Sequence, residues 1–249
     1  MNKLKVFLWK GKEFIKGIFV YPKFQMNPNE EFNYDSYWDK RKKEVGETFG
    51  KLNAWQAKRA QMVINFLSKA RDITIADVAS GSGNILKYIK DNVSTKNVIA
   101  YDFSPDSVKT AKENGLNAEI LDVSNLDNLS TISVHDYFLL FEILEHLPNS
   151  ELVLNKIYSK ANKGVFLSVP NTGFVSHRLR MIFGRFPMQW RQFPNEHVRF
   201  WTLKDMHWWL RALGFKKYKV ISYMGVPILK NILPNLFAAG IFVYIEREN

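Results

Sequence analysis

From residue 73 onward, short apolar runs alternate with amphipathic stretches along the chain. Apolar runs bounded by Gly, Asp, Asn or Ser predict buried strands, and the longer stretches between them predict helices. The predicted strands are Ile73–Val78, Val98–Tyr101, Glu119–Leu121, Tyr137–Phe141 and Val165–Val169. Because strands that alternate with helices are joined by right-handed crossovers, this order predicts a parallel sheet with helices on both faces.

Cap residues and helical spacing locate the predicted helices. The apolar positions recur at helical spacing over residues 50–70, and Ser104 followed by Pro105 is a helix start. The predicted helices cover 50–70, Asn84–Lys90, a stretch after Ser104, about 150–160 and a stretch from Thr202 to Gly214. Two further strands, Phe215–Ile221 and Phe237–Ile245, lie close together with no clear helix between them, so we expect this pair to be antiparallel.

Composition indicates an ordinary folded protein with an uneven positive charge. The net charge is +11 over 249 residues, and it gathers in residues 1–25 and 178–219, which leaves the rest slightly acidic. Such clusters favour an anionic partner, although they are equally typical of a basic soluble surface. The chain has no cysteine, which excludes disulfides, thiolate metal sites and cysteine nucleophiles.

A glycine-containing turn after the first predicted strand is the sharpest motif. The string ITIADVASGSGN occupies residues 73–84, and Gly81 and Gly83 would let the backbone approach a ligand. Asp77 at the strand end would repel a pyrophosphate, and Leu86 stands where dinucleotide-binding proteins have their third glycine. S-adenosylmethionine (SAM) carries an ammonium and a sulfonium but no phosphate, so it fits this turn better.

Two more aspartates follow the next two predicted strands. Asp102 lies 25 residues after Asp77, at the end of the second strand, where a carboxylate can accept both hydroxyls of a ribose. Asp122 follows the third strand. An aspartate at any one strand end is commonly a cap or a turn residue, but three at successive strand ends beside the glycine turn favour a nucleoside-containing cofactor.

With these motifs, residues 50–249 resemble the class I SAM-dependent methyltransferases, whose first motif is an acidic residue followed by a G-x-G-x-G turn. Ala79 replaces the first glycine here, a change that we expect to be tolerated. The resemblance implies a Rossmann-like, mostly parallel sheet with one antiparallel strand near the C-terminus. It also implies SAM as the cofactor. The implied cofactor-binding residues are Asp77, Ala79, Gly81, Gly83, Asp102, Phe103, Asp122, Val123 and Glu142.

The string DYFLLFEILEHLPN after the fourth predicted strand carries the candidate chemistry. Its E-x-x-E-H pattern resembles the ubiquinone-biosynthesis O-methyltransferases and implies a site for Mg²⁺ or another divalent cation at Glu142, Glu145 and His146. His146, with Glu145, is alternatively a candidate general base. The plainer interpretation is that Glu145 and His146 only brace the loop through hydrogen bonds.

Residues 170–201 form a predicted insertion that covers the substrate. The strings VPN and PNEHVRFWT resemble the methionine-biosynthesis W-type methyltransferases, a looser likeness than that of the cofactor motifs. His197, as a further candidate catalytic residue, could orient an acceptor together with Glu196 and Arg199. Equally, the arginines and tryptophans of this segment could simply pack over the edge of the sheet.

The resemblance implies methyl transfer to an oxygen of a small-molecule, sugar or lipid-linked acceptor, which the charge suggests is anionic. A nucleic-acid acceptor is disfavoured, because the chain lacks the (Asn/Asp)-Pro-Pro-(Tyr/Phe) string of base-nitrogen methyltransferases and the cysteine of carbon-5 methylation. Two alternatives stay open: an RNA methyltransferase, and a SAM-binding regulatory partner of another enzyme that catalyses nothing itself.

Residues 1–49 are interpreted as a basic, aromatic appendage and lid. Lysines interleave with large apolar residues over residues 1–20, which suits peripheral contact with an anionic membrane or closure over the cofactor cleft. An amphipathic helix packed on the domain explains the pattern equally well. We expect a cytoplasmic protein, peripheral at the inner membrane surface if the membrane contact is made.

Overall fold

The computed structural model describes residues 18–19, 51–187 and 196–248. Most of the predicted appendage and lid, and part of the predicted insertion, therefore lie outside the described residues. No helix in the described part of the chain is long and apolar enough to cross a membrane.

A single seven-stranded sheet organises the described residues, in the order β3-β2-β1-β4-β5-β7-β6. β7 runs antiparallel to both of its neighbours, and all other adjacent strands are parallel. This arrangement confirms the predicted fold class. The strands are β1 (Ile73–Val78), β2 (Thr95–Asp102), β3 (Asn117–Ile120), β4 (His135–Phe141), β5 (Ala161–Pro170), β6 (Tyr218–Tyr223) and β7 (Gly240–Glu246).

The helices begin where side chains cap them. Asn53 and Thr202 each form a capping box, and Ser104 caps a helix with Pro105 at its first position. The helices are α3 (Ala54–Leu67), α4 (Asn84–Lys90), α5 (Pro105–Glu113), α6 (Asn128–Thr131), η1 (Leu144–His146), α7 (Ser150–Ser159), α8 (Val175–Ile182), α10 (Leu203–Ala212), α11 (Leu229–Ile232) and α12 (Pro234–Phe237).

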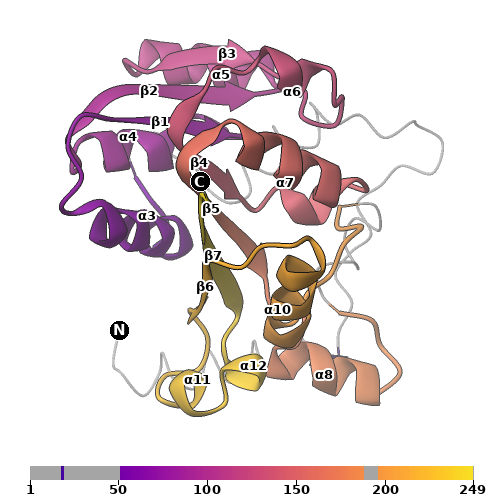
Figure 1. The fold of residues 1–249 in the computed structure, drawn as a ribbon. Coiled ribbons are helices and arrows are strands. Elements are labelled where there is room, and N and C mark those ends of the chain that lie inside the picture. Colours follow the sequence, from indigo (N-terminus) through magenta and orange to yellow (C-terminus); the bar gives the residue numbers. More distant parts are fainter. Residues whose placement is uncertain (1–17, 20–50, 188–195, 249) are drawn as a thin grey trace.

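Helices cover both faces of the sheet, each over its own hydrophobic cluster (Figure 1). The apolar sides of α3, α4 and α5 pack on one face, around residues such as Val63, Leu86 and Val108. On the other face α7 and α10 contribute Leu154 and Trp209. Burial of these two clusters fixes the sheet between two helical layers and leaves the carboxyl ends of the parallel strands for ligands.

Three segments differ from the sequence prediction. The short helices α11 and α12 lie between β6 and β7, where we expected no helix, and β7 consequently begins at Gly240 rather than at Phe237. Four-residue helices show no apolar periodicity, so the pattern could not reveal them. Pro234 begins α12, a position that its fixed φ favours. The predicted insertion also contains a helix, α8.

Candidate functional site

The carboxyl ends of β1, β2 and β4 meet at one edge of the sheet. Asp77 lies near the end of β1, Asp102 ends β2, and Glu142 directly follows β4. Because β1 is paired with both β2 and β4 in parallel, these three residues lie at the same edge of the sheet, and their role in cofactor binding stays a prediction. In open α/β sheets this edge is the ligand-binding edge.

The glycine turn is a run of left-handed backbone. Ala79, Gly81 and Gly83 have φ values of 60°, 57° and 77°. A Cβ at Gly83 would lie 2.5 Å from Leu116 Cδ1, so the end of that side chain would have to shift, and the positive φ itself favours glycine there. Ala79 adopts the same backbone region at a conformational cost of about 1 kcal/mol. A glycine, which the family motif has at this position, would avoid that cost.

Asp102 ties this turn to the second strand. Its Oδ2 accepts a hydrogen bond from Gly81 N at 2.7 Å, and its Oδ1 accepts one from Ser104 N at 3.0 Å. The side chain is buried. An ionised carboxylate has about four acceptor positions, so Asp102 can hold the turn and still accept hydrogen bonds from a ribose.

The predicted adenine-contacting residues lie in the loops after β2 and β3. Asp122 is exposed, two residues past the end of β3, and accepts hydrogen bonds from the backbone N and the Oγ of Ser124. Val123 is buried, whereas Phe103 is 37% exposed. Contact of Asp122, Phe103 and Val123 with an adenine stays a prediction.

Arg59 is a buried cation in this site that the sequence prediction missed. Its Nη1 lies 3.3 Å from Glu142 Oε1 and donates a hydrogen bond to the Tyr223 hydroxyl at 3.2 Å. Ser168 Oγ and Tyr223 OH also donate to Glu142 Oε1, at 2.8 and 3.3 Å. The available signal was Arg59's place four residues before Val63, on the buried stripe of α3.

Asp77 is almost completely buried beside these charges. Burial, and then the negative charge of Asp102, raise the pKa of Asp77 to about 8, although Arg59 offsets part of the rise. The carboxyl is therefore largely protonated at neutral pH. A ligand ammonium near Asp77 would favour the ionised form of its carboxyl, so this edge of the sheet is suited to binding a cationic ligand.

Glu145, His146 and His197 form a compact cluster at the other side of Glu142. One ligand atom from each lies within 4.8 Å of the others. Glu145 is fully buried, and among the described residues neither of its carboxyl oxygens has a hydrogen-bond partner. Burial, and then the charge of Glu142, raise the pKa of Glu145 well above its usual range. An unsatisfied buried carboxyl is uncommon in proteins and calls for a functional explanation.

The residues after the gap in the described chain complete this cluster. Val198 N and Arg199 N donate to the backbone O of Glu145 at 2.9 and 3.1 Å. The rings of His146 and His197 meet edge to face, with centroids 4.7 Å apart. His146 Nδ1 contacts the backbone O of Glu196. A carbonyl oxygen only accepts, so Nδ1 carries the proton and the neutral ring has its lone pair on Nε2.

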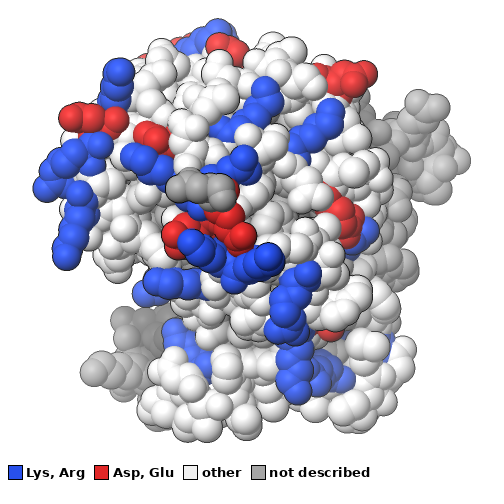
Figure 2. All heavy atoms as spheres, viewed as in Figure 1, with Lys and Arg blue, Asp and Glu red and all other residues white. Residues whose placement is uncertain are grey.

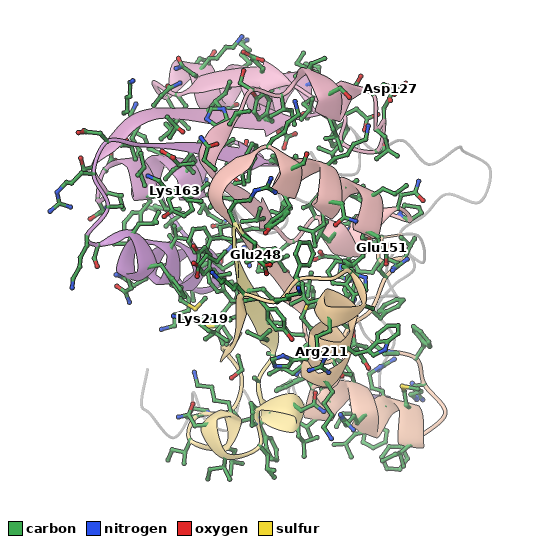
Figure 3. All side chains as sticks on the ribbon, in the orientation of Figure 1. Asp127, Glu151, Lys163, Arg211, Lys219 and Glu248 are labelled. Carbon is green, nitrogen blue, oxygen red and sulfur yellow. The ribbon has the colours of Figure 1, made fainter. Side chains whose placement is uncertain are left out.

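The structure separates the predicted site residues into two groups. Glu142 lies outside the cluster and is held by Arg59, whereas His197, which comes 51 residues after His146 in the sequence, takes the third position. Arg199 is engaged elsewhere: it pairs with Glu151 of α7, labelled in Figure 3, and its guanidinium lies 5.8 Å from the Trp201 ring centroid. These contacts favour packing over acceptor binding for Arg199.

Three solved structures with a similar fold are described as methyltransferases. A putative methyltransferase in complex with the Trm112 activator from Haloferax volcanii has a TM-score of 0.60 at 14% identity, covering 86% of this chain and 96% of that one. A SAM-dependent methyltransferase from Archaeoglobus fulgidus has a TM-score of 0.58 at 17% identity, covering 87% and 100%.

The small RNA methyltransferase HEN1 has a TM-score of 0.57 at 20% identity, covering 90% of this chain but 28% of that one. These likenesses establish the fold, and they give no support to the expectation that nucleic acid is disfavoured as an acceptor.

The family is established by the sequence itself. No curated protein matches the chain. The family model described as a methyltransferase domain, however, matches residues 52–220, from before α3 into β6 and over more than half of the chain. This stretch contains the glycine turn, Asp77, Asp102 and the Glu145–His146 pair. The chain therefore belongs to the methyltransferase-domain family and is a SAM-dependent methyltransferase.

Proposed function

We propose that this protein transfers the methyl group of SAM to an oxygen of its acceptor, with Glu145, His146 and His197 activating that oxygen. The supporting observation is the buried carboxyl of Glu145, which has no hydrogen-bond partner among the described residues and lies within 4.8 Å of a ring nitrogen of His146 and of His197. Such a group has little structural value, because burying it without partners costs free energy. It has clear chemical value beside a reacting hydroxyl.

Arg59 connects this cluster with the cofactor side of the site. Its positive charge acts on Glu142 and Glu145 as well as on Asp77. Arg59 can therefore offset the negative charge of these acidic side chains. In the same position it can attract the carboxylate of the methionine part of SAM. Bound SAM supplies an electrophilic methyl group, which passes to the acceptor oxygen while the sulfonium becomes a neutral thioether.

The acceptor must lose its proton as the new oxygen–carbon bond forms. Without a bound cation, His146 Nε2 carries the lone pair that can take this proton, because Nδ1 is oriented by Glu196 O. Placing the hydroxyl in line with the methyl carbon and removing its proton supply most of the rate acceleration in such a displacement.

The same three residues suit a divalent cation. One carboxylate and two imidazoles are a common donor set for first-row metals, and the unsatisfied oxygens of Glu145 provide the anionic ligand. A cation held by Glu145, His146 and His197 would lower the pKa of the acceptor hydroxyl. Glu142, which the sequence included in this set, would then act by holding Arg59 instead.

Full-length protein should transfer labelled methyl groups from SAM, and excess chelator should stop the reaction until Mg²⁺ or Mn²⁺ is restored. The acceptor panel should include phenols, sugars, lipid-linked hydroxyls and small RNA. His197→Ala should abolish Mn²⁺ binding measured by calorimetry. His207→Ala is the matched control, because His207 is a half-buried histidine of α10 packed near Tyr218, outside the cluster.

Unchanged turnover in excess chelator would remove the cation and leave His146 as a base. Transfer to the small RNA alone would favour the RNA alternative, which the HEN1 likeness and the basic residues 178–219 support. SAM binding with no transfer to any acceptor would favour a regulatory partner.

A further inference from the structure

Eight exposed apolar side chains of the described residues lie on α8, on α11 and on the segments that flank them. We call this set the apolar pole; Ile182, Ile228 and Ile232 are 75%, 73% and 66% exposed. Its members are Met181, Ile182, Phe183, Phe186, Ile228, Leu229, Ile232 and Leu233. Exposed apolar residues scattered singly need no explanation, but a contiguous group marks an interaction surface.

The segments of the apolar pole lie together at one end of the molecule. Figure 1 shows α8, α11 and α12 side by side at the lower end. Asn171, which precedes α8, is buried and donates hydrogen bonds from Nδ2 to the backbone O of Ala238 at 2.6 Å and of Asn235 at 3.3 Å. These hydrogen bonds join the segment before α8 to the region of α12, so the elements that carry the apolar pole are held together at this point.

The apolar pole is also free of acidic residues. Residues 171–187 and 224–238 contain no Asp or Glu, but they contain Arg178, which is exposed, and Arg185 and Lys230, which are half-buried; Arg180 is fully buried. The lowest part of the face seen in Figure 2 is accordingly white. Lysine and arginine around apolar side chains are typical of surfaces that lie in the interface of an anionic bilayer.

The described end of the basic N-terminal segment meets this same surface. Arg180 Nη1 donates to the backbone O of Ile18 at 3.0 Å, and the Phe19 and Phe183 ring centroids are 5.1 Å apart. Residues 1–16 carry five lysines and one glutamate. Phe19, which follows this cationic segment in the sequence, therefore contacts the apolar pole.

The place of the apolar pole in the fold and its positive charge favour a membrane surface over a second copy of the chain as its binding partner. β5 and β6 both end at the ligand-binding edge of the sheet, and α8 and α11 follow those ends, so the pole lies on the side from which an acceptor reaches the site. A second copy bound through a two-fold axis would bring Arg178, Arg185 and Lys230 of both chains together with no acidic partner in these segments. Anionic headgroups would pair with these cations.

We propose that the apolar pole docks the protein on an anionic membrane surface, with Ile182, Phe183, Ile232 and Leu233 entering the headgroup region. Docking is peripheral, since no described helix can span a bilayer. The proposal does not depend on which atom is methylated. It places the ligand-binding edge beside a lipid surface, from which a lipid-borne acceptor could be taken.

The test is co-sedimentation of the full chain with vesicles of phosphatidylcholine mixed with phosphatidylglycerol, and with vesicles of phosphatidylcholine alone. We expect binding to the mixed vesicles that weakens with salt. Ile182→Ser with Phe183→Ser, and separately Ile232→Ser with Leu233→Ser, should each lower partition by about tenfold or more, because these side chains supply the inserted apolar area. Calorimetric SAM binding should be unchanged in both variants.

Ile120→Ser with Val134→Ser is the matched control. These side chains are 62% and 58% exposed; Ile120 ends β3 and Val134 directly precedes β4, away from the pole. Control and wild-type chains should bind vesicles equally. The proposal is overturned if the pole variants bind like wild type, if wild type binds neither kind of vesicle, or if sedimentation shows a dimer that Ile182→Ser with Phe183→Ser dissolves.

Discussion

Glu145→Gln is expected to make the protein more stable in the presence of chelator and almost inactive when a divalent cation is supplied. Glu145 is fully buried, and its carboxyl oxygens have no partner among the described residues. Glutamine keeps the shape and removes the cost of burying an ionisable group, so the free energy of unfolding should rise by about 1–2 kcal/mol at neutral pH. Methyl transfer should fall by about 10²-fold or more, because the cluster loses its anionic group. Urea unfolding in chelator and the transfer assay measure the two effects.

Glu151→Gln is the control for this prediction, since it makes the same change at a carboxylate that has partners. Glu151 pairs with Arg199 and accepts a hydrogen bond from Trp209 Nε1 at 2.7 Å. Glu151→Gln should therefore lower stability and leave transfer largely intact. If Glu145→Gln instead loses stability and keeps its activity, Glu145 braces the loop and has no chemical role.

Asp77→Asn should show a gain in stability that grows with pH and a loss of SAM affinity. The pKa of Asp77 is raised from 3.8 to about 8 by burial and by Asp102. Between these values the folded protein holds a proton that the unfolded chain releases, so wild-type stability falls by up to about 1.4 kcal/mol per pH unit as pH rises. Below about pH 4 both states are protonated and above about pH 8 both are ionised, so the change with pH ends there.

SAM affinity has the opposite pH dependence at Asp77. The ligand ammonium favours the ionised carboxyl, so wild-type affinity should increase with pH up to about 8, with a proton released on binding. Asp77→Asn should bind SAM about tenfold or more weakly and without that pH dependence. Asp106→Asn, an exposed change in the first turn of α5, should follow wild type in both measurements. A wild-type affinity that is flat from pH 5 to about 8 would remove Asp77 from the ligand's surroundings.

Both predictions concern acids that are costly to bury. The position of Asp77 at a strand end could be predicted from the sequence, whereas the surroundings of Glu145 could not. The apolar run Ile73–Val78 and the residues Asn84–Lys90 are confirmed as a strand and a helix with the predicted bounds. A short, mostly apolar run that ends in a glycine turn favours a buried strand over other secondary structures. Asp77 and Asp102 lie at or near the carboxyl ends of such strands. It could therefore be predicted that both residues lie at the same edge of the sheet.

The second half of the site depends on contacts that no local pattern contains. His197 reaches Glu145 and His146 because the backbone at Val198 and Arg199 bonds to Glu145 O. Arg59 was missed because hydropathy assigns an arginine to a surface, whereas Glu142 and Tyr223 stabilise it in the interior. The helices α11 and α12 bury none of their residues, so they left no apolar stripe to be found.

Calorimetric titration of SAM into the full chain tests the central claim most directly. The account predicts one binding event with a dissociation constant on the order of micromolar. Asp102→Ala should weaken it by about tenfold or more, because a lost buried acceptor costs about 1–3 kcal/mol. Asp106→Ala, four residues further along and exposed, should bind like wild type. No binding of SAM to folded wild-type protein would contradict the account.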